Sequence, residues 1–359
     1  MSLPPVEIPL GAMRFNSDSQ KLEYWNGQIW MQIHTFSPNL DGGARAVFGG
    51  SYSYGPGGSY PKTNIIDYIT IATAGNAIDF GDLTETRGVG AGGASRTRGL
   101  FCGGQIKPAA AKTSNVVDYI TISSTGNAAD FGDLTVKGSA GIAGMSNQTR
   151  MVCAGRNTQD PAFGVDVNTI DYATIASTGN FVDFGDMVDA TGGSAPIYGV
   201  SGSGNGVRGI ISGGDEGPAY DPTIKFITMA TLGNSQDFGE QTQSTSGTGS
   251  CSSSTRTLIS SGATPGIKNL IDMVTIATTG NAVDFAANNF TTQHRFPEAV
   301  SDCVRAVFSG GYGAGPTYTV STDIDYTNFS SGGNCVDFGD LTAGAANHKG
   351  ASNGHGGLG

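Results

Sequence analysis

A strand pattern followed by a fixed turn runs from Asn115 to Leu134, NVVDYITISSTGNAADFGDL. Apolar and polar side chains alternate through VDYITI, which predicts a β-strand. The Thr125-Gly126-Asn127 segment predicts a tight turn, because glycine reaches positive φ at low cost and asparagine tolerates the left-handed region. The short AADFGDL segment then predicts a strand that returns antiparallel to the first.

This unit recurs six times, so it is the element of a repeat. Successive copies lie about fifty residues apart, and a period of this length predicts a propeller or solenoid rather than one irregular domain. The copies begin at Asn64, Asn115, Asn168, Pro222, Asn269 and Thr322, and the aspartates of their DF pairs are Asp79, Asp130, Asp183, Asp237, Asp284 and Asp337.

A second signature precedes each copy, an arginine followed by a short apolar run and then glycine. It predicts a buried strand that ends in a tight bend. The Gly/Ala/Ser-rich stretch before the arginine, such as RGVGAGGAS, predicts a further strand, because the innermost strand of a propeller blade has no room for large side chains. The repeat arginines are Arg45, Arg98, Arg150, Arg208, Arg256 and Arg305.

Together these elements predict an all-β chain with four strands per repeat, arranged as a six-bladed β-propeller over residues 34–359. The C-terminal AANHKGASNGHGGLG is similar to the small-residue strand GVGAGGASRTRGL, although no DFGDL unit follows it. We therefore expect residues 344–359 to supply the inner strand of the blade that contains Arg45 and so to close the ring. Closure of this kind predicts that deleting these residues destabilises the whole domain.

Residues 1–33 follow a different pattern. They predict a strand, a turn, a strand, a turn at Asn26-Gly27 and a third strand, and they contain both tryptophans of the chain, Trp25 and Trp30. A hairpin of this size is marginally stable alone. We expect it to pack on another protein or on the propeller, and we favour an attachment module. A simple cap on the first blade is the alternative.

Composition argues against several classes of function. A net charge of −11 without a basic stripe argues against nucleic acid as a ligand. The five cysteines are odd in number and scattered, which predicts buried small side chains rather than disulfides or a CxxC metal site. No run is long enough to cross a bilayer, and MSLPPVEIPL lacks the features of a signal peptide, so we expect synthesis in a cytoplasm without membrane insertion.

The DF aspartates recur in step with the arginines. A group that recurs in every blade is architectural, because a ligand site would break the symmetry. We expect each aspartate to cap its turn or to pair with a repeat arginine between blades, so Asp130→Ala should lower the melting temperature. Calcium bound by DxxD carboxylates such as Asp79 and Asp82 is the alternative. We otherwise expect no metal, no cofactor and no catalytic residue, since the four histidines are far apart in the sequence.

Loop length varies at one side of the repeat only. The interval from Tyr68 to Phe80 recurs unchanged in every copy, whereas the connections after the glycine bend and after DFGDL vary. In an up-and-down blade these two connections lie on the same face, and loops on a rigid scaffold often carry binding sites. We expect a glycan or protein ligand to bind there through Tyr52, Tyr54, Tyr60, Tyr220, Tyr312 and Tyr318, because tyrosine-rich loops suit recognition and stack on sugars. Loops that vary because nothing constrains them are the alternative.

The glycine-ended strand, tyrosine strand and aromatic strand resemble the kelch repeat, with Tyr119 and Phe131 at the places of the kelch tyrosine and tryptophan. Phenylalanine for tryptophan and the TGNxxDFGD turn depart from that pattern. The sequence pattern GG…IDYITIATTGNAxDFGDLT…TRxxFxGG resembles the kelch-like repeats of tail and fibre proteins of tailed bacteriophages, notably those of cyanobacteria. The segment GAMRFNSDSQKLEYWNGQIW resembles a short motif near the attachment ends of phage tail-fibre and structural proteins.

The resemblance covers nearly the whole chain and implies a non-enzymatic virion component, a tail-fibre or baseplate-associated protein assembled in the host cytoplasm. It implies that residues 1–33 join other tail proteins and that the protein is a homo-oligomer, commonly a trimer in fibres. A lectin-like kelch propeller outside a virion is the first alternative. A kelch-like sugar oxidase or epimerase is the second, and it would need an asymmetric cluster of His, Tyr, Cys or acidic residues that the sequence does not display.

Overall fold

The computed structural model of the chain describes residues 8–16, 21–32, 44–52, 62–106, 113–138, 141–158, 165–189, 191–195, 197–215, 220–260, 262–264, 266–267, 269–285, 290–292, 294–313 and 319–358. The chain divides into two compact units, Met1–Gly42 and Gly43–Gly359. Their placement relative to one another is not determined, so each is described by itself.

The smaller unit is a three-stranded antiparallel sheet. It contains β1 (Met13–Asn16), β2 (Lys21–Trp25) and β3 (Trp30–Gln32) in that order. The β2–β3 turn is fixed by Asn26, whose Oδ1 accepts hydrogen bonds from the backbone N–H groups of Gln28 and Ile29 at 2.9 and 2.8 Å. Gly27 takes a φ of 96°, which other residues rarely adopt.

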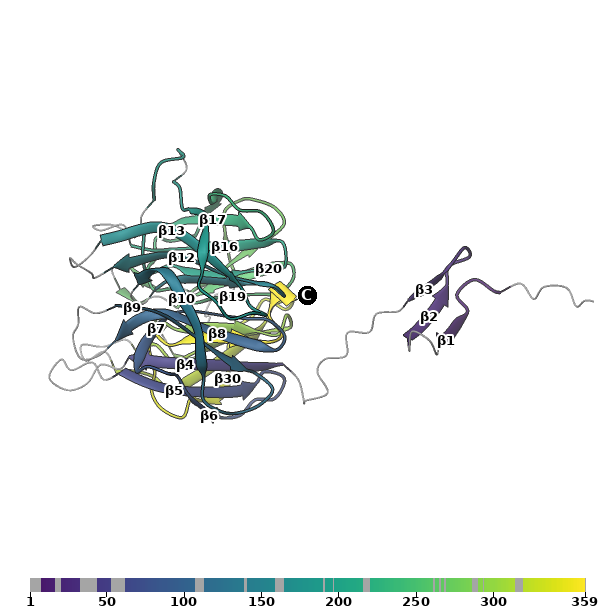
Figure 1. Ribbon diagram of the computed structural model, residues 1–359, viewed down its shortest axis with the longest axis horizontal. Coiled ribbons are helices and arrows are strands. Elements are labelled where there is room, and N and C mark those ends of the chain that lie inside the picture. The colour runs from purple at the N-terminus through teal and green to yellow at the C-terminus, as the bar shows by residue number, and fades with distance from the viewer. Residues whose placement is uncertain are drawn as a thin grey trace, which may run out of the picture. The chain divides into compact units, whose positions relative to one another are not determined.

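The larger unit contains six four-stranded antiparallel sheets (Figure 1). The first sheet is β31-β4-β5-β6 (Lys349–Ser352, Arg45–Tyr52, Lys62–Thr70, Ile78–Asp82), the second β7-β8-β9-β10 (Arg87–Ala94, Arg98–Ile106, Thr113–Thr121, Ala129–Gly138) and the third β11-β12-β13-β14 (Ala143–Ser146, Arg150–Thr158, Val165–Thr174, Val182–Asp186). The fourth is β15-β16-β17-β18 (Ser201–Gly204, Arg208–Ser212, Thr223–Thr228, Gln236–Glu240), the fifth β19-β20-β23-β24 (Ser250–Ser252, Arg256–Ser260, Ile271–Thr275, Val283–Asp284) and the sixth β26-β27-β29-β30 (Glu298–Ser301, Arg305–Ser309, Asp323–Asn328, Val336–Asp340).

Shorter elements complete this unit. Two ribbons pair β21 (Ala263–Thr264) with β22 (Gly266–Ile267) and β25 (His294–Arg295) with β28 (Tyr312–Gly313), and a 3-10 turn, η2, spans Gly356–Leu358. The prediction of an all-β chain built from four-stranded antiparallel sheets is confirmed. The small-residue strands β7, β11, β15, β19, β26 and β31 contact one another in that cyclic order, β31 meeting β7, which is compatible with a β-propeller-like fold.

The first sheet combines the two ends of the larger unit. β31 pairs antiparallel with β4, Gly350 lying opposite Phe48. The Asn353 side chain accepts a hydrogen bond from the backbone N–H of Arg45 at 2.8 Å, just as Asn147 accepts one from Arg150 at 2.9 Å inside the continuous hairpin of the third sheet. The C-terminal segment therefore supplies the same strand and the same turn contact that a continuous chain supplies elsewhere.

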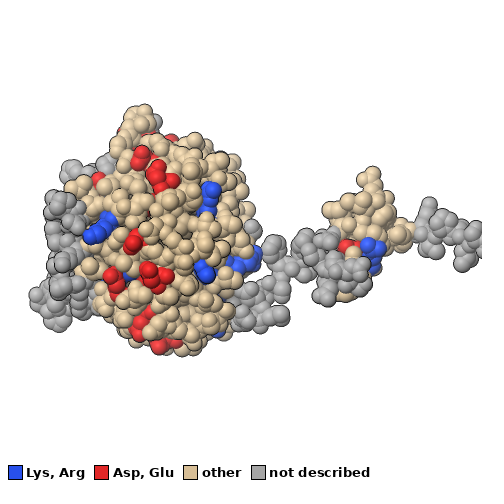
Figure 2. All heavy atoms as spheres, viewed as in Figure 1, with Lys and Arg blue, Asp and Glu red and all other residues tan. Residues whose placement is uncertain are grey.

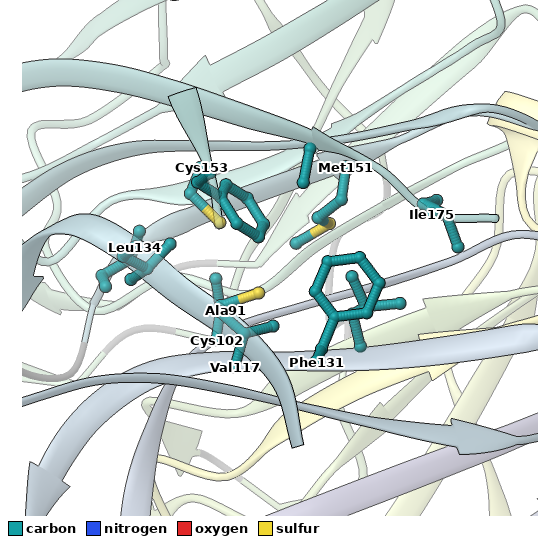
Figure 3. Packing of buried hydrophobic residues seen from close by; sticks show 12 residues of the cluster. Ala91, Cys102, Val117, Phe131, Leu134, Met151, Cys153 and Ile175 are labelled. Carbon is teal, nitrogen blue, oxygen red and sulfur yellow. The ribbon is translucent and has the colours of Figure 1, made fainter. Parts of the chain in front are cut away.

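The hydrophobic core lies between neighbouring sheets rather than inside one of them. Between the second and third sheets, Cys102 and Phe131 pack with Met151 and Cys153, all of them buried (Figure 3). Within each of five sheets an edge-to-face aromatic pair joins the third and fourth strands, as Tyr119 and Phe131 do with ring centres 6.1 Å apart. Such a pair stabilises by about 0.5–1.5 kcal/mol beyond its area burial.

Each repeat arginine links its own sheet to the next one. Nη1 of Arg150 donates to the carbonyl oxygen of Met229 at 2.9 Å, and the guanidinium lies over the Tyr172 ring, 5.0 Å from its centre. The same bond joins Arg45 to Ile122, Arg98 to Ile175, Arg208 to Ile276, Arg256 to Phe329 and Arg305 to Ile71. The last of these bonds joins the sixth sheet to the first.

The TGN turn protects the outer edge of the preceding sheet. The N–H groups of Gly126 and Ala128 donate to the carbonyl oxygens of Phe80 and Asp82 at 2.8 Å, and Asn127 Oδ1 accepts from the Asp82 N–H at 3.1 Å. An unpaired outer strand would be open to aggregation. A Cβ on Gly81 would come within 2.5 Å of the Gly126 carbonyl, so this approach requires glycine at position 81, whereas Gly126 has open space around it and is restricted by its φ of 153°. This pairing explains why the turn has a constant length.

The prediction that the DF aspartates pair with the repeat arginines is wrong. The arginines bond to carbonyl oxygens, and the side chains of Asp79, Asp130, Asp183, Asp237, Asp284 and Asp337 are exposed. Figure 2 shows Asp and Glu side chains in separate groups on the visible face of this unit. The buried aspartates lie one strand earlier, before the tyrosine position. Asp171, for example, accepts hydrogen bonds from the N–H and Oγ1 of Thr135 on the preceding sheet at 3.0 and 2.7 Å.

We expect Arg150→Ala to lower the unfolding free energy by about 1.5–3 kcal/mol, because it removes a charged hydrogen bond between sheets and a cation–π contact. Asp130→Ala should change it by no more than about 0.5 kcal/mol, as is usual for an exposed side chain. Urea unfolding of the two variants decides the point. An equal loss of unfolding free energy in the two variants would instead support the arginine–aspartate pair that the sequence suggested.

Candidate binding face and central cavity

The larger unit has two unlike ends. Each second strand runs from its repeat arginine, beside the TGN turns, to the opposite end of the sheet. We call the end with the repeat arginines and the TGN turns the turn end. We call the opposite end the loop end; there each second strand connects to its third strand, and outer strands connect to inner strands. In the first sheet Arg45 lies at the turn end and Tyr52 at the loop end, since Arg45 pairs with Thr70 and Tyr52 with Lys62.

The predicted recognition tyrosines differ in where they lie. Tyr54, Tyr60 and Tyr318 lie outside the described residues, as does the side chain of Tyr52. Tyr220 is partly exposed at the loop end and forms an isolated β-bridge with Asp215. The interpretation of Tyr312 as a solvent-facing residue is wrong. It is 6% exposed, because β28 pairs with β25 and its ring packs edge-to-face on Phe296 at 6.2 Å.

A polar group that the sequence did not single out lies beside Tyr220. We call it the loop-end cluster; it consists of Asn157, Asp166, Tyr198, Asp215 and Tyr220. Tyr198 donates to Asp215 Oδ2 at 3.1 Å, and Asn157 Nδ2 donates to Asp166 Oδ1. Burial, with the nearby Asp215 charge, raises the pKa of Tyr198 to about 12, so the phenol stays a donor. Burial also raises the pKa of Asp166, with a smaller contribution from Asp215.

The cluster offers carboxylate acceptors, an amide and phenol groups on a rigid scaffold. These groups recognise neutral hydroxylated ligands, since each hydroxyl can donate to a carboxylate and accept from a phenol. The residues come from β12, β13 and two separate loops, so sequence spacing could not reveal their proximity. In the described residues, no group of three or more His, Cys, Asp or Glu side chains could hold a metal ion, and calcium at the DxxD pairs has no support there.

A central cavity of about 60 Å³ lies between the small-residue strands, which line it mainly with glycine and serine. Its charged lining residue is Glu298, which accepts from Lys349 Nζ at 3.1 Å and from the Gly350 N–H at 2.9 Å. Burial raises the pKa of Glu298, and the lysine charge opposes that rise. A cavity of this size has room for about four water molecules and is too small for a sugar ring.

The C-terminal residues cover this cavity at the turn end. His355 lines the cavity, and its Nε2 lies 2.9 Å from the carbonyl oxygen of Ala94 while its Nδ1 accepts from the Gly357 N–H at 3.1 Å. Arg96 then holds the chain end by donating to the Leu358 carbonyl. The described residues after β31 thus contact hairpins of several sheets and cover the central cavity at the turn end.

Acid should destabilise the larger unit through His348. Burial lowers the pKa of this imidazole to about 3, and its Nε2 lies 2.8 Å from Ser309 Oγ. Because the folded pKa is depressed below the ordinary value of 6.5, the stabilisation is present above pH 6.5 and falls as the pH drops, by about 1.4 kcal/mol per pH unit. Asp67, Asp118, Asp272, Asp325 and Glu298 have pKa values raised chiefly by burial, so each of them opposes this loss over the pH range in which it takes up a proton in the folded protein.

We therefore expect His348 to lower the free energy of unfolding by about 1 kcal/mol between pH 6.5 and pH 5.5. His348→Gln, which keeps a polar group near Ser309 but cannot be protonated, should remove this contribution and leave that of His355, whose pKa is also lowered by burial. Urea titrations of the two proteins at the two pH values measure the difference. The same pH dependence in the wild-type protein and in His348→Gln would contradict the burial of a neutral imidazole.

The smaller unit presents unlike faces. Trp25 and Trp30 lie on one face with ring centres 5.6 Å apart, and the Arg14 guanidinium lies 4.2 Å from the Trp30 ring centre. Both tryptophans are partly buried by these contacts. The other face is apolar and exposed, and it consists of Met13, Phe15, Leu22, Tyr24 and Met31. The exposed apolar positions of this unit are therefore mainly residues other than the predicted tryptophans.

The described residues contain no helix of the length and apolarity that crossing a membrane requires. No family model and no curated protein matches the chain.

Proposed function

We propose that residues 43–359 form a closed six-bladed β-propeller and that the protein is a non-enzymatic component of a phage virion, a tail-fibre or baseplate-associated protein that recognises a host surface. Two observations support the closed propeller: the cyclic contacts of the inner strands, and the hydrogen bonds between the sixth sheet and the first. Arg305 donates to Ile71 there, as its equivalents do between the other neighbours, and Thr342 donates to Asp67, as equivalent threonines do at four of the other five seams.

The observation that carries the proposal is the position of the chain entry. Ala44 lies at the turn end, where its carbonyl accepts from the Ile71 N–H at 2.9 Å and where Gly354 lies against it. The first described residue of the larger unit therefore lies at the end opposite the loop-end cluster. A protein anchored through its N-terminal unit would leave its variable loops free to meet a ligand.

The smaller unit fits the role of the anchor. Its exposed apolar face is large for so small a sheet, and exposed patches of this kind mark interaction sites. Other tail proteins of the virion are the partners that the sequence resemblance implies. The loop-end cluster suits a glycan, because its donors and acceptors match sugar hydroxyls and Tyr220 offers part of a ring face.

The test compares the full-length protein with two variants on a glycan array and on host cells. Tyr198→Phe/Asp215→Asn removes the phenol donor and the charge of the loop-end cluster, and Tyr52→Ala/Tyr54→Ala/Tyr60→Ala removes the aromatic residues of the predicted recognition loop that follows β4. Asp130→Ala serves as a matched surface control. Binding that either variant lowers at least tenfold and the control retains would support recognition at the loop end.

A second measurement addresses the anchor. Phe15→Lys/Met31→Lys should prevent incorporation into virions while leaving the melting temperature of the larger unit unchanged. Incorporation at the wild-type level would contradict the anchoring role of the apolar face. Glycan binding by a protein that never enters a virion would instead favour the lectin-like alternative.

A further inference from the structure

Buried aspartates recur between the sheets, but they are not neutralised in the same way. Asp67, Asp118, Asp171, Asp272 and Asp325 each accept hydrogen bonds from a threonine of the preceding sheet. A buried carboxylate needs a counter-charge or a proton, because its charged form is costly away from water.

Two of these aspartates have a guanidinium partner. Arg87 Nη2 lies 3.1 Å from Asp118 Oδ2, and Arg156 Nη2 lies 2.6 Å from Asp171 Oδ1. All four side chains are fully buried. One guanidinium thus lies against the buried aspartate at each of these two seams between sheets, and Arg87 also lies 3.4 Å from the partly exposed Glu85 carboxylate.

The seam between the sixth and first sheets has a different composition. Ser51 stands at the position of Arg156, since each lies six residues after the repeat arginine of its strand. Asp67 is 6% exposed, and among the described side chains no lysine or arginine pairs with it. Its bonds with Thr342, at 2.7 and 2.8 Å from Oγ1, supply hydrogen-bond donors but no positive charge.

A pocket of about 30 Å³ lies at this seam, and Ser51, Thr63, Asp67, Thr342 and His348 contribute its polar lining. It has room for about two water-sized groups. Ser51 Oγ and Thr63 Oγ1 are 3.1 Å apart. His348 is 2% exposed, and its Nδ1 has no hydrogen-bond partner within the described part of the chain. The pocket therefore combines one carboxylate, several hydroxyl oxygens and a buried ring nitrogen that needs a polar neighbour.

We propose that this pocket binds a small monovalent cation of sodium or potassium size, which balances Asp67 as Arg87 and Arg156 balance their aspartates. Carboxylate and hydroxyl oxygens are hard donors that suit such an ion. A single carboxylate favours one positive charge over two.

The position of the pocket gives the cation a structural effect. It lies where the last sheet meets the first, so an ion there adds to the contacts between the two ends of the unit. Ser51 and Thr63 also flank residues 53–61, which hold Tyr54 and Tyr60. Binding of the ion would stabilise the strand ends from which that predicted recognition loop starts.

The experiment measures the melting temperature of the full-length protein in sodium, potassium or choline chloride at constant ionic strength. We expect sodium or potassium to raise it over choline by about 2–4 °C, with saturation, because a ligand that binds only the folded state stabilises it. Asp67→Asn should abolish the response, and Asp272→Asn, at an equivalent threonine-bonded aspartate, should retain it.

Two further measurements keep the test decisive if Asp67→Asn does not fold. Ser51→Arg supplies a guanidinium at the position of Arg156, so it should remove the sodium response. Sodium-23 relaxation should show bound ion in the wild-type protein and none in Ser51→Arg. Equal melting temperatures in choline and sodium, a response to calcium alone, or a response that Asp272→Asn abolishes equally would overturn the proposal.

Discussion

Deleting residues 344–359 is expected to abolish cooperative unfolding of the larger unit. The deletion removes β31, so β4 loses its antiparallel partner and the inner strand of the first sheet is missing. It also removes Lys349 and leaves the Glu298 carboxylate buried without its cation, which by itself costs about 3–5 kcal/mol. Domains of this kind are stable by only about 5–15 kcal/mol. Circular dichroism with thermal melting should show no sharp transition.

Two matched variants separate the loss of the strand from simple shortening of the chain. Removing residues 354–359 alone keeps β31 and Asn353, so a cooperative transition should persist at a lower temperature. A permuted chain that joins Asn353 to Arg45 through Gly43 and Ala44 has two residues between them, as Asn147 and Arg150 do. With new ends between Thr158 and Val165 it should melt at or above the wild-type temperature. A sharp wild-type transition in the 344–359 deletion would show that the first sheet does not need β31.

Much of the fold could be predicted from the sequence because every repeat carries the same signals. The period, the arginine strand, the TGN turn and the glycine-rich strand recur together, so an error in one copy is corrected by the others. The C-terminal strand carried its own signal, the similarity of HKGAS to the small-residue stretches. Its pairing with β4 then follows from the first repeat, where only the three small residues Gly42, Gly43 and Ala44 stand directly before the arginine.

The partners of the polar residues could not be predicted in the same way. In this unit both faces of each sheet pack against a neighbour, so alternation does not distinguish the buried Asp118 from the exposed Asp130. The arginines bond to carbonyl oxygens, which every residue has, and no sequence signal identifies the acceptor. Tyr312 was misassigned because its loop composition resembles that of recognition loops, whereas the β25–β28 ribbon buries it.

The loop-end cluster and the buried ion pairs had no repeat signal at all. Arg87 lies at the start of an inner strand and Arg156 near the end of a second strand, yet each reaches the aspartate of its own sheet. Residues that depart from the repeat, such as Ser51 and Arg156 at a position where the other four copies have glycine, therefore mark places where one seam differs from the next. The features that the copies share could not reveal these departures.

Arg156→Met is expected to lower the free energy of unfolding by about 3–5 kcal/mol, because it leaves Asp171 buried with no counter-charge. The guanidinium makes two bonds to that carboxylate, at 2.6 and 3.2 Å, and a third to the Val136 carbonyl at 2.9 Å. Methionine fills much of the same volume, so the loss reports the charge rather than a cavity.

The double variant Arg156→Met/Asp171→Asn provides the control for this interpretation. Asparagine keeps an oxygen that can accept from Thr135 but carries no charge, so it removes the penalty that the single variant creates. The double variant should unfold at a higher urea concentration than Arg156→Met alone, with a coupling of about 1–3 kcal/mol in the mutant cycle. Strict additivity would mean that Asp171 is already neutral in the folded protein, and the stabilisation at this seam would then come from the carbonyl and threonine bonds alone.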